Sequence, residues 1–349
     1  MDFSITPYDG NSARDIAHQM KLWPSLAGKA YSLEHGAGDS IFFYDSPPQI
    51  LAGTEYKSEP IVKQSSGTYD SPPVFVLIHG LGDEADSWRH IIPLLNAGGY
   101  RVLAPDLPGF GRSVATGKFS LKTHADAVLT LIKEIGNRDW GIGEGGSFPA
   151  IFMAGNSLGA MVAEEAALRK PGRGSSSPVL VRGLVLIDGS IPGGPSNPGA
   201  MALAKLLFSR KWYRAYRGKP ERAWASLYPY YADLDSMSCE DREFLKTRVI
   251  ARVESNTQER AFFATQSSLI WAFLTGPSKF TKKIRQYKGK ILLIWGEKDR
   301  IIPLSSMEAF KALRSDIKLE LVSGAGHLPH QEKPEETARL MLNECQAPN

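Results

Sequence analysis

Short apolar runs alternate with amphipathic stretches along most of this chain. An unbroken apolar run suits a parallel strand that is covered on both faces, and apolar residues at helical spacing indicate helices. Strand-like stretches, most of them apolar, lie at 74–78, 101–104, 148–154, 183–187, 290–295 and 317–322. The helical patterns lie at 86–97, 120–136, 160–170, 304–314 and 334–345. This alternation predicts an α/β fold with a doubly wound, mainly parallel sheet.

The N-terminal part follows a different pattern. Residues 1–30 indicate a short helix and a connector, and 30–45 indicate two strands around a Gly-rich turn at 36–39. Residues 46–72 contain paired prolines and little periodicity, which is typical of a surface insertion.

Residues 191 to about 285 interrupt the strand and helix alternation. They contain several helix-like stretches without a convincing strand, and Ser238 and Ser255 each begin a capping-box pattern. The stretches 199–217 and 257–274 are rich in aromatic residues. We therefore divide the chain into a first core part at 1–190, a helical cap at 191–287 and a second core part at 288–349.

Composition excludes several classes of protein. Apolar residues make up 42% and charged residues 22%, as in globular proteins. The net charge is +4, but residues 191–290 contain 18 Lys and Arg against 8 Asp and Glu, a local net charge of +10. The basic, aromatic cap could attract an anionic substrate or make peripheral contact with an acidic membrane. Aromatic packing within the cap and solvated Lys and Arg side chains are the alternative.

The terminus and the cysteines bear on location. Asp2 stands where a signal peptide would carry a basic residue, and no apolar run approaches about 18 residues. Cys239 and Cys345 match neither a disulfide framework nor a metal-ligand spacing. We expect a cytoplasmic protein without membrane insertion that acts on a small molecule and does not bind nucleic acid. The oligomeric state is left open.

Ser157 lies between Gly155 and Gly159, after an apolar run and before a helical pattern. In a strand, tight turn and helix, G-x-S-x-G forms a nucleophile elbow, where glycines admit a backbone too crowded for Cβ atoms. The alternative is an ordinary helix start in which Ser157 or Asn156 is the N-cap.

An acid and a histidine follow two later strands. Asp299 comes after the run at 290–295, and His327 comes after the run at 317–322. A serine nucleophile needs a base within hydrogen-bond reach and a group that orients this base. Asp188, at the end of the run at 183–187, is an alternative acid.

Five motifs occur together in order: HG-x-G at 79–82, D-x-P-G-x-G-x-S at 106–113, G-x-S-x-G at 155–159, G-x-x-D-x-x-x-P at 296–303 and G-x-G-H at 324–327. In this ordered set the chain resembles α/β-hydrolases of the capped type over roughly residues 30–345. The resemblance implies that Ser157 is the nucleophile, His327 the general base and Asp299 the acid that orients it. It also implies an oxyanion hole made by the backbone N–H groups of Leu81 and Leu158.

Other residues are assigned less specific roles. Trp88 and Asn156 are candidates to line the substrate pocket, with core packing as the alternative for Trp88. His79 is interpreted as structural, and His330 as a surface residue or one behind the site. The glycines at 141–146 lack the Lys-Ser or Lys-Thr of a phosphate loop. We expect no cofactor and no metal.

The serine narrows the chemistry that the resemblance implies. Capped relatives that open epoxides or remove halogens have an aspartate at the elbow, so Ser157 favours attack on a carbonyl. The main hypothesis is hydrolysis of a small apolar, aromatic or lipid-like ester through an acyl-enzyme. Cleavage of a C–C bond in a diketone and acyl transfer use the same three residues and stay open. A noncatalytic ligand receptor on this fold is an alternative of another class.

Overall fold

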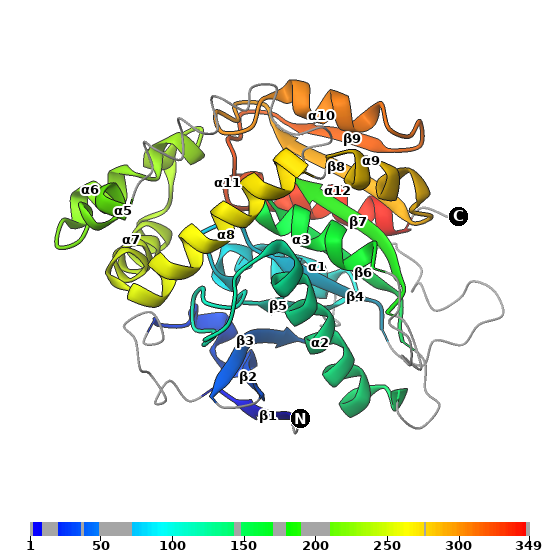
Figure 1. Ribbon diagram of the computed structural model, residues 1–349, viewed down its shortest axis with the longest axis horizontal. Helices are drawn as coiled ribbons and strands as arrows, with labels where there is room; N and C mark the ends of the chain where they lie inside the picture. Colours follow the sequence, from blue (N-terminus) through cyan, green and yellow to red (C-terminus); the bar gives the residue numbers. More distant parts are fainter. Residues whose placement is uncertain are drawn as a thin grey trace.

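The computed structural model describes residues 3–8, 20–35, 38–48, 72–142, 148–169, 179–189, 210–275 and 277–346. Nine strands of these residues form one sheet in the order β1-β2-β3-β5-β4-β6-β7-β8-β9 (Figure 1). The strands are β1 (Phe3–Pro7), β2 (Ala30–His35), β3 (Asp39–Ser46), β4 (Val74–Ile78), β5 (Arg101–Pro105), β6 (Ile151–Asn156), β7 (Val181–Ile187), β8 (Lys290–Gly296) and β9 (Lys318–Val322).

In this spatial order, β1, β2, β3 and β5 pair in antiparallel fashion. The strands from β5 through β4 and β6 to β9 pair in parallel. The predicted α/β fold with a mainly parallel sheet is confirmed. All five residues of β4 are buried, as an apolar run between two helix layers requires.

The short helix expected within residues 1–30 is present as a 3-10 helix at Pro24–Lys29. The first residues instead form strand β1, which the sequence did not predict. Ile5 pairs with Leu33 of β2, and its side chain is partly buried against the core. A five-residue strand that ends at Pro7 shows too little alternation to be recognised, and proline is tolerated there because β1 is an edge strand. Residues 9–19 lie outside the described residues, and so do residues 49–71 of the insertion predicted at 46–72. Ser46 at its start belongs to strand β3.

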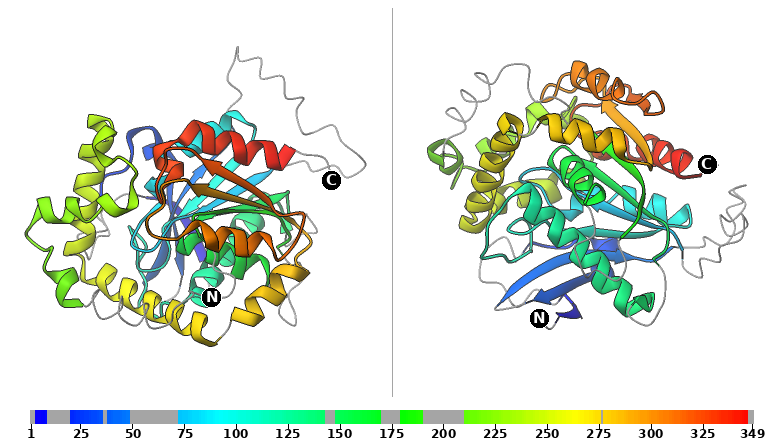
Figure 2. Two further views of the ribbon diagram at one scale, coloured as in Figure 1. Left: turned by 90° about the horizontal axis from the view of Figure 1, so that it is seen from above. Right: turned by 45° about the vertical axis from the view of Figure 1, so that its right-hand side comes forward.

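Helices cover both faces of the sheet (Figure 2). The core helices are α1 (Ile91–Ala97), α2 (Leu121–Asp139), α3 (Leu158–Ala167), α10 (Leu304–Lys311), α11 (Pro329–Glu332) and α12 (Pro334–Gln346). Along β4, Val76 and Ile78 pack into one core cluster with α2 and α3, while Phe75 and Leu77 pack into another with α1 and α12. The two-residue period of a strand thus supplies both hydrophobic cores.

The helix predicted over 86–97 is shorter in the structure. A 3-10 helix at Ala85–Trp88 precedes α1, and α1 begins only at Ile91. Pro93 explains the break, because proline has no N–H to donate to the carbonyl of residue 89 and is tolerated only in the first turn of a helix. The carboxylate of Asp86, in the preceding 3-10 turn, accepts hydrogen bonds from the Trp23 N–H and the Tyr44 hydroxyl.

The chain between β7 and β8 forms helices without strands in its described part. They are α5 (Arg210–Arg214), α6 (Pro220–Ala225), α7 (Cys239–Glu254), α8 (Asn256–Thr275) and α9 (Pro277–Gln286). The predicted boundary at 191 and the first part of the helix expected over 199–217 lie outside the described residues. In Figure 1, α5, α6 and α7 lie together at one side of the core, and α8 leads from them back toward β8.

The second predicted boundary, at 287, assigns α9 to the cap, but α9 packs on the core. Ile284 is fully buried in the core cluster, and Lys283 forms an ion pair with Glu165 of α3. We keep the word cap for α5 to α8. None of the helices in the described ranges is both long enough and apolar enough to cross a bilayer.

Candidate active site

Ser157 occupies a sharp turn between β6 and α3. Its φ of 53° and ψ of −114° are rare for a residue with a side chain. A Cβ atom at Gly155 would overlap the backbone of Gly159, and one at Gly159 would overlap the Ile78 carbonyl oxygen. The Ser157 side chain does not cap α3, so the strained elbow, and not the ordinary helix start, describes this turn.

Asp299 and His327 lie side by side beyond the ends of β8 and β9. His327 Nδ1 is 2.9 Å from Asp299 Oδ2, and both side chains are almost completely buried. The other carboxylate oxygen, Asp299 Oδ1, accepts hydrogen bonds from the N–H groups of Ile301 and Ile302 at 2.7 and 3.1 Å. Because the carboxylate accepts from Nδ1–H, Nε2 of the neutral ring is left with a lone pair.

Asn156 joins the serine turn to the histidine loop. Its Nδ2 donates to the carbonyl oxygens of His327 at 3.0 Å and Ile187 at 3.2 Å. The N–H group of Ser157 also donates to Ile187 O, at 2.9 Å. Asn156 is buried and therefore acts as a bridge between two loops, although the sequence suggested it as a pocket residue.

The loop after β4 lies directly against the serine turn. A Cβ atom at Gly80 would lie 3.1 Å from Asn156 Oδ1 and 3.6 Å from Ser157 Cβ, so only glycine allows this approach without displacement. Leu81 follows in the same loop, and Leu158 is the first residue of α3. The N–H groups of a first helical turn have no acceptor within their own helix, which leaves the Leu158 N–H available for a ligand.

The cap reaches both loops of the site. The N–H group of His327 donates to Tyr230 O in the cap at 2.8 Å, and the two rings lie 5.9 Å apart. On the other side, Phe262 of α8 packs against Gly82, where an added Cβ would lie 3.2 Å from the phenyl ring. The cap thus helps to hold the histidine and covers the loop that carries Leu81.

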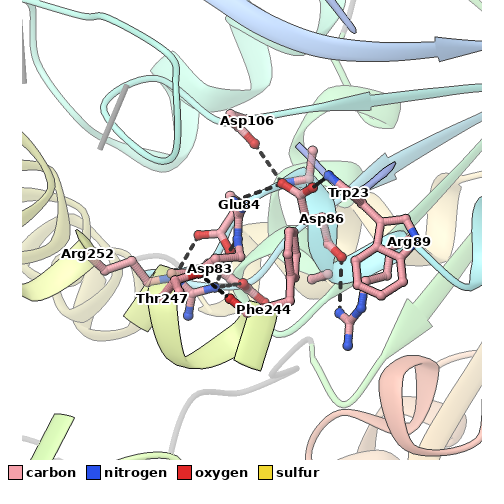
Figure 3. A network of polar contacts seen from close by, with 12 residues as sticks. Trp23, Asp83, Glu84, Asp86, Arg89, Asp106, Phe244, Thr247 and Arg252 are labelled. Atoms are coloured by element: carbon pink, nitrogen blue, oxygen red, sulfur yellow. Dashed lines mark hydrogen bonds and ion pairs between the residues drawn. The ribbon is translucent and has the colours of Figure 1, made fainter. Parts of the chain in front are cut away.

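A buried network of charges ties the cap to that same loop (Figure 3). Arg252 of α7 points toward Asp83 and Glu84, and its Nε lies 2.6 Å from Glu84 Oε2. Arg248, one helical turn earlier, pairs with Glu84 at 2.5 Å and with Asp86 at 2.8 Å. These contacts join residues more than 160 positions apart.

The network continues into the core. Arg112 is buried between Asp86 and Asp106, and it pairs with Asp106 at 3.0 Å. Burial raises the pKa of the Glu84 carboxyl, but Arg248 and Arg252 outweigh burial, so the net pKa lies below its ordinary value. For Asp83, burial and the charge of Glu84 outweigh the attraction of Arg252 and raise the pKa. The loop that carries Leu81 is therefore held by ionic contacts with the cap.

Asp188, the alternative acid, lies beside the acid that contacts the histidine. One oxygen of Asp188, one of Asp299 and one ring nitrogen of His327 all lie within 4.8 Å of one another. The direct contact with the imidazole nevertheless comes from Asp299. The geometry thus assigns the orienting contact to Asp299 and leaves a second carboxyl next to it.

The remaining candidates have structural contacts. His79 accepts from the Leu107 N–H through Nε2 and lies 2.8 Å from Gly80 O through Nδ1, as its structural interpretation requires. Trp88 is fully buried in a core cluster, 4.3 Å from the His330 ring, which favours packing over a pocket role. Of the two alternatives for His330, the surface position is wrong, because the side chain is fully buried. Burial lowers the pKa of His330 to about 3.

Sequence reasoning missed Tyr230 and the two arginines of α7. The Tyr230 contact with His327 is made by a backbone carbonyl, which has no sequence signal. Arg248 and Arg252 lie four positions apart and therefore on one face of the helix that Ser238 begins. This spacing was the available signal, but it could not identify Glu84 as the partner.

The molecule is an α/β protein whose polar candidates gather at the carboxyl ends of parallel strands, a common place for enzyme sites. The profile of the alpha/beta hydrolase family matches residues 75–340. The chain therefore belongs to the alpha/beta hydrolase family, a family of hydrolase-type enzymes.

Relatives with assigned names differ in the bond that they cleave. The chain is 28% identical to a pimeloyl-[acyl-carrier protein] methyl ester esterase of Methylococcus capsulatus, over 77% of this chain and 93% of the relative. It is 27% identical to a 2-hydroxy-6-oxo-6-phenylhexa-2,4-dienoate hydrolase of Burkholderia cepacia, over 77% and 86%. It is 34% identical to epoxide hydrolase B of Mycobacterium tuberculosis, but over only 42% of each chain.

Solved structures agree on the fold. The carboxylesterase CesB of Bacillus subtilis superimposes with a TM-score of 0.64, at 18% identity and over 92% of each chain. This similarity concerns the backbone arrangement, and the chemistry depends on the residues described above.

Proposed function

We propose that this protein is a serine hydrolase that cleaves a carboxylic ester through an acyl-enzyme. The observation that carries the proposal is the contact of 2.9 Å between Asp299 and His327. Asn156, the residue before Ser157, donates a hydrogen bond to the His327 carbonyl and so holds the histidine loop beside the serine turn. A nucleophile, a base and an orienting acid on three neighbouring loops are the components of acyl transfer by serine.

The reaction follows from the groups available. Ser157 Oγ attacks the ester carbonyl carbon and gives its proton to His327 Nε2, while Asp299 accepts the Nδ1–H hydrogen bond of the imidazolium. The Leu81 and Leu158 N–H groups stabilise the oxyanion. His327 then returns the proton to the departing alcohol, and a water molecule attacks the acyl-enzyme by the same path. The products are an alcohol and a carboxylic acid, and Ser157 is regenerated.

The cap supports an apolar acyl or aromatic substrate. Phe262, which packs at Gly82, belongs to a cluster of rings with Tyr213 and Phe263, at centroid distances of 5.3 to 5.7 Å. The relatives whose names describe a methyl ester esterase and a lipase support ester cleavage. A ring cluster above the Leu81 loop favours burial of an apolar group of the substrate.

The basic charge of the cap supports an anionic substrate or contact with an acidic membrane less strongly than the ring cluster supports an apolar substrate. Three arginines, at 210, 214 and 217, pair with Glu259, and two more, at 248 and 252, pair with the loop after β4. Arg248 and Arg252 are balanced by acidic partners of their own, but Arg210, Arg214 and Arg217 share one carboxylate and keep a positive charge. We favour a neutral ester because of the aromatic rings of the cap, with an anionic ester as the alternative.

Cleavage of a C–C bond is the second candidate function. It is favoured by the relative from Burkholderia cepacia, whose name describes a hydrolase of a dienoate with a keto group. Acyl transfer to an alcohol or amine would use the same acyl-enzyme and would differ only in the acceptor. A noncatalytic receptor would bind a ligand in the same place without turnover.

A paired substrate screen tests the proposal. Wild type and Ser157→Ala are assayed with p-nitrophenyl esters of increasing acyl length and with vinylogous diketones, and both are treated with a fluorophosphonate probe. We expect ester turnover and covalent labelling in wild type and neither in Ser157→Ala. Diketone cleavage without ester turnover would favour the C–C hydrolase. Tight binding of an ester without labelling or turnover would favour the receptor.

A further inference from the structure

A second buried carboxyl stands next to the triad acid, and the proposed mechanism does not use it. Asp188 follows β7 as Asp299 follows β8, and because these strands are parallel neighbours, both residues lie at the same edge of the sheet. Asp188 is 0% exposed, and the Asp299 side chain is also completely buried. Two carboxyl groups thus face each other in a space closed to solvent.

The Asp188 side chain has one satisfied oxygen and one unsatisfied oxygen. Oδ1 accepts from the Gly296 N–H at 2.8 Å, and the Asp188 N–H donates to Ile294 O at 3.0 Å. Oδ2 is buried and has no hydrogen-bond donor among the described residues. The residue is also held at a φ of 43°, a left-handed conformation that aspartate and asparagine tolerate better than most residues.

The surroundings disfavour a charge on Asp188. Burial raises the pKa of its carboxyl well above the ordinary value, the charge of Asp299 raises it further, and Glu332 adds a smaller effect in the same direction. The Gly296 N–H group acts in the opposite direction but does not outweigh them. Asp299, His327 and Glu332 are the titratable groups that face Asp188 from the loops after β8 and β9 and from α11.

We propose that Asp188 is a neutral carboxylic acid whose Oδ2–H donates a hydrogen bond to the Asp299 carboxylate and so positions the acid that orients His327. A proton on Oδ2 gives the unsatisfied oxygen a partner and removes the repulsion between two adjacent carboxylates. Asp188 is a positioning residue, because it acts on the imidazole through Asp299. The inference rests on the proposed function for its kinetic consequences but not for the position of the proton.

The donated hydrogen bond has a predictable effect on the base. It draws charge from Asp299, so the imidazolium of His327 is less strongly stabilised than it would be by an unassisted carboxylate. Loss of the donor therefore raises the pH at which His327 loses its proton and weakens the orientation of the ring. The acidic limb of the kcat/KM profile reports this proton loss in the free enzyme.

Two variants separate a neutral donor from a charged group. Asp188→Asn keeps an acceptor for Gly296 and a neutral donor for Asp299, and Asp188→Gly removes the donor without straining a φ of 43°. We expect Asp188→Gly to lower kcat by about 10- to 100-fold, the range expected for loss of a hydrogen bond to a charged group. KM should change little, and the acidic limb of kcat/KM should move to higher pH. The separate variant Asp188→Asn should keep turnover within about threefold of wild type and should leave the acidic limb of kcat/KM at the wild-type pH.

Opposite outcomes would overturn the inference. If Asp188 were ionised, Asp188→Asn would remove a negative charge and move the acidic limb to lower pH. If Asp188→Gly kept wild-type turnover and the wild-type limb, no positioning hydrogen bond would exist. Loss of activity on dialysis against a chelator would show that a cation, and not a proton, lies between the carboxyls.

An infrared measurement tests the proton without any turnover. In D2O at neutral pH, Ser157→Ala protein should show the C=O stretch of a protonated carboxyl that is missing when Asp188→Asn is added. The difference between the two proteins separates the Asp188 band from absorption by other carboxyls, among them Asp83 and Glu332, whose pKa values are also raised by burial. If wild type hydrolyses no ester but the Asp188 band is present, the proposed function fails and the inference stands. If wild type hydrolyses esters but the Asp188 band is absent, the inference fails and the proposed function stands.

Discussion

Asp299 Oδ2 lies 2.9 Å from Nδ1 of His327, and Asp299 Oδ1 is fixed by two backbone N–H groups of its own loop. The carboxylate therefore cannot turn away from the imidazole without losing these two bonds. This contact specifies that Nδ1 carries the proton of the neutral ring and leaves Nε2 with a lone pair.

Replacement of Asp299 by Asn should remove this control. The Asn amide can donate to Nδ1, which favours the wrong tautomer, so we expect kcat for an ester to fall by about 10³- to 10⁴-fold while the fold is retained. Steady-state kinetics together with circular dichroism measure both effects. The matched control is Glu297→Gln on the same loop, whose exposed side chain contacts Ser323 and Gly324 and should leave kcat within about twofold. An equal effect of both changes would contradict the role of Asp299.

Arg252→Met should destabilise the protein by leaving Glu84 with one buried cationic partner fewer. Removal of one member of a buried ion pair costs about 3 to 5 kcal/mol, because an uncompensated charge remains. Urea unfolding measures the loss as a lower midpoint. The turnover number should also fall, since Asp83 and Glu84 belong to the loop that carries Leu81.

A second pair on the same helix serves as the control for Arg252. Lys246 of α7 pairs with Glu221, whose side chain is 80% exposed, and exposed pairs contribute about 0 to 1 kcal/mol. Lys246→Met should therefore leave the urea midpoint nearly unchanged. If the two variants unfold at the same urea concentration, the buried network does not stabilise the contact between cap and core.

The stability of the protein should depend on the charge state of His124. Burial lowers the pKa of His124 from 6.5 to about 3, so between these pH values the unfolded chain binds a proton that the folded protein does not. The stabilising contribution is thus complete above pH 6.5 and is lost as the pH falls toward 3, with a slope of at most about 1.4 kcal/mol per pH unit.

Unfolding free energies measured from pH 7 to pH 4 test the His124 contribution. His124→Gln cannot bind the proton and should reduce the slope of stability against pH by up to that amount. Thr265→Val is the control, because it removes the hydroxyl 2.9 Å from His124 Nε2 but leaves the titrating ring in place. It should lower stability at every pH without reducing the slope, and the opposite pattern would show that the ring does not cause the slope.

The fold and the three main candidates were accessible from the sequence because each depends on local patterns. The parallel strands are mostly apolar, and loops at their carboxyl ends carry Ser157, Asp299 and His327 within recognisable motifs. The choice between Asp188 and Asp299 could not be made from local patterns. Both follow adjacent strands, so both reach the same edge of the sheet, and only the coordinates identify which carboxylate contacts the imidazole.

Long-range contacts explain what could not be predicted. Glu84 and Arg252 are 168 positions apart, and neither neighbourhood contains a pattern that names the other. The assignment of α9 to the cap failed for a similar reason: burial of Ile284 depends on α9 returning to the core beside α3. An amphipathic sequence shows that a helix has a buried face but not the element that buries it.

Gly159→Ala should abolish both the elbow and the labelling of Ser157. A methyl group at this position would overlap the Ile78 carbonyl oxygen in β4, and backbone cannot move aside as a flexible side chain can. We expect the free energy of unfolding to fall by at least about 1 to 3 kcal/mol, which is the usual range for overpacking in a well-packed interior. Thermal unfolding and fluorophosphonate labelling measure the two effects. Gly117→Ala is the matched control, because an added Cβ there meets nothing within 4 Å. It should label like wild type, whereas normal labelling of Gly159→Ala would mean that helix α3 need not pack so closely on β4.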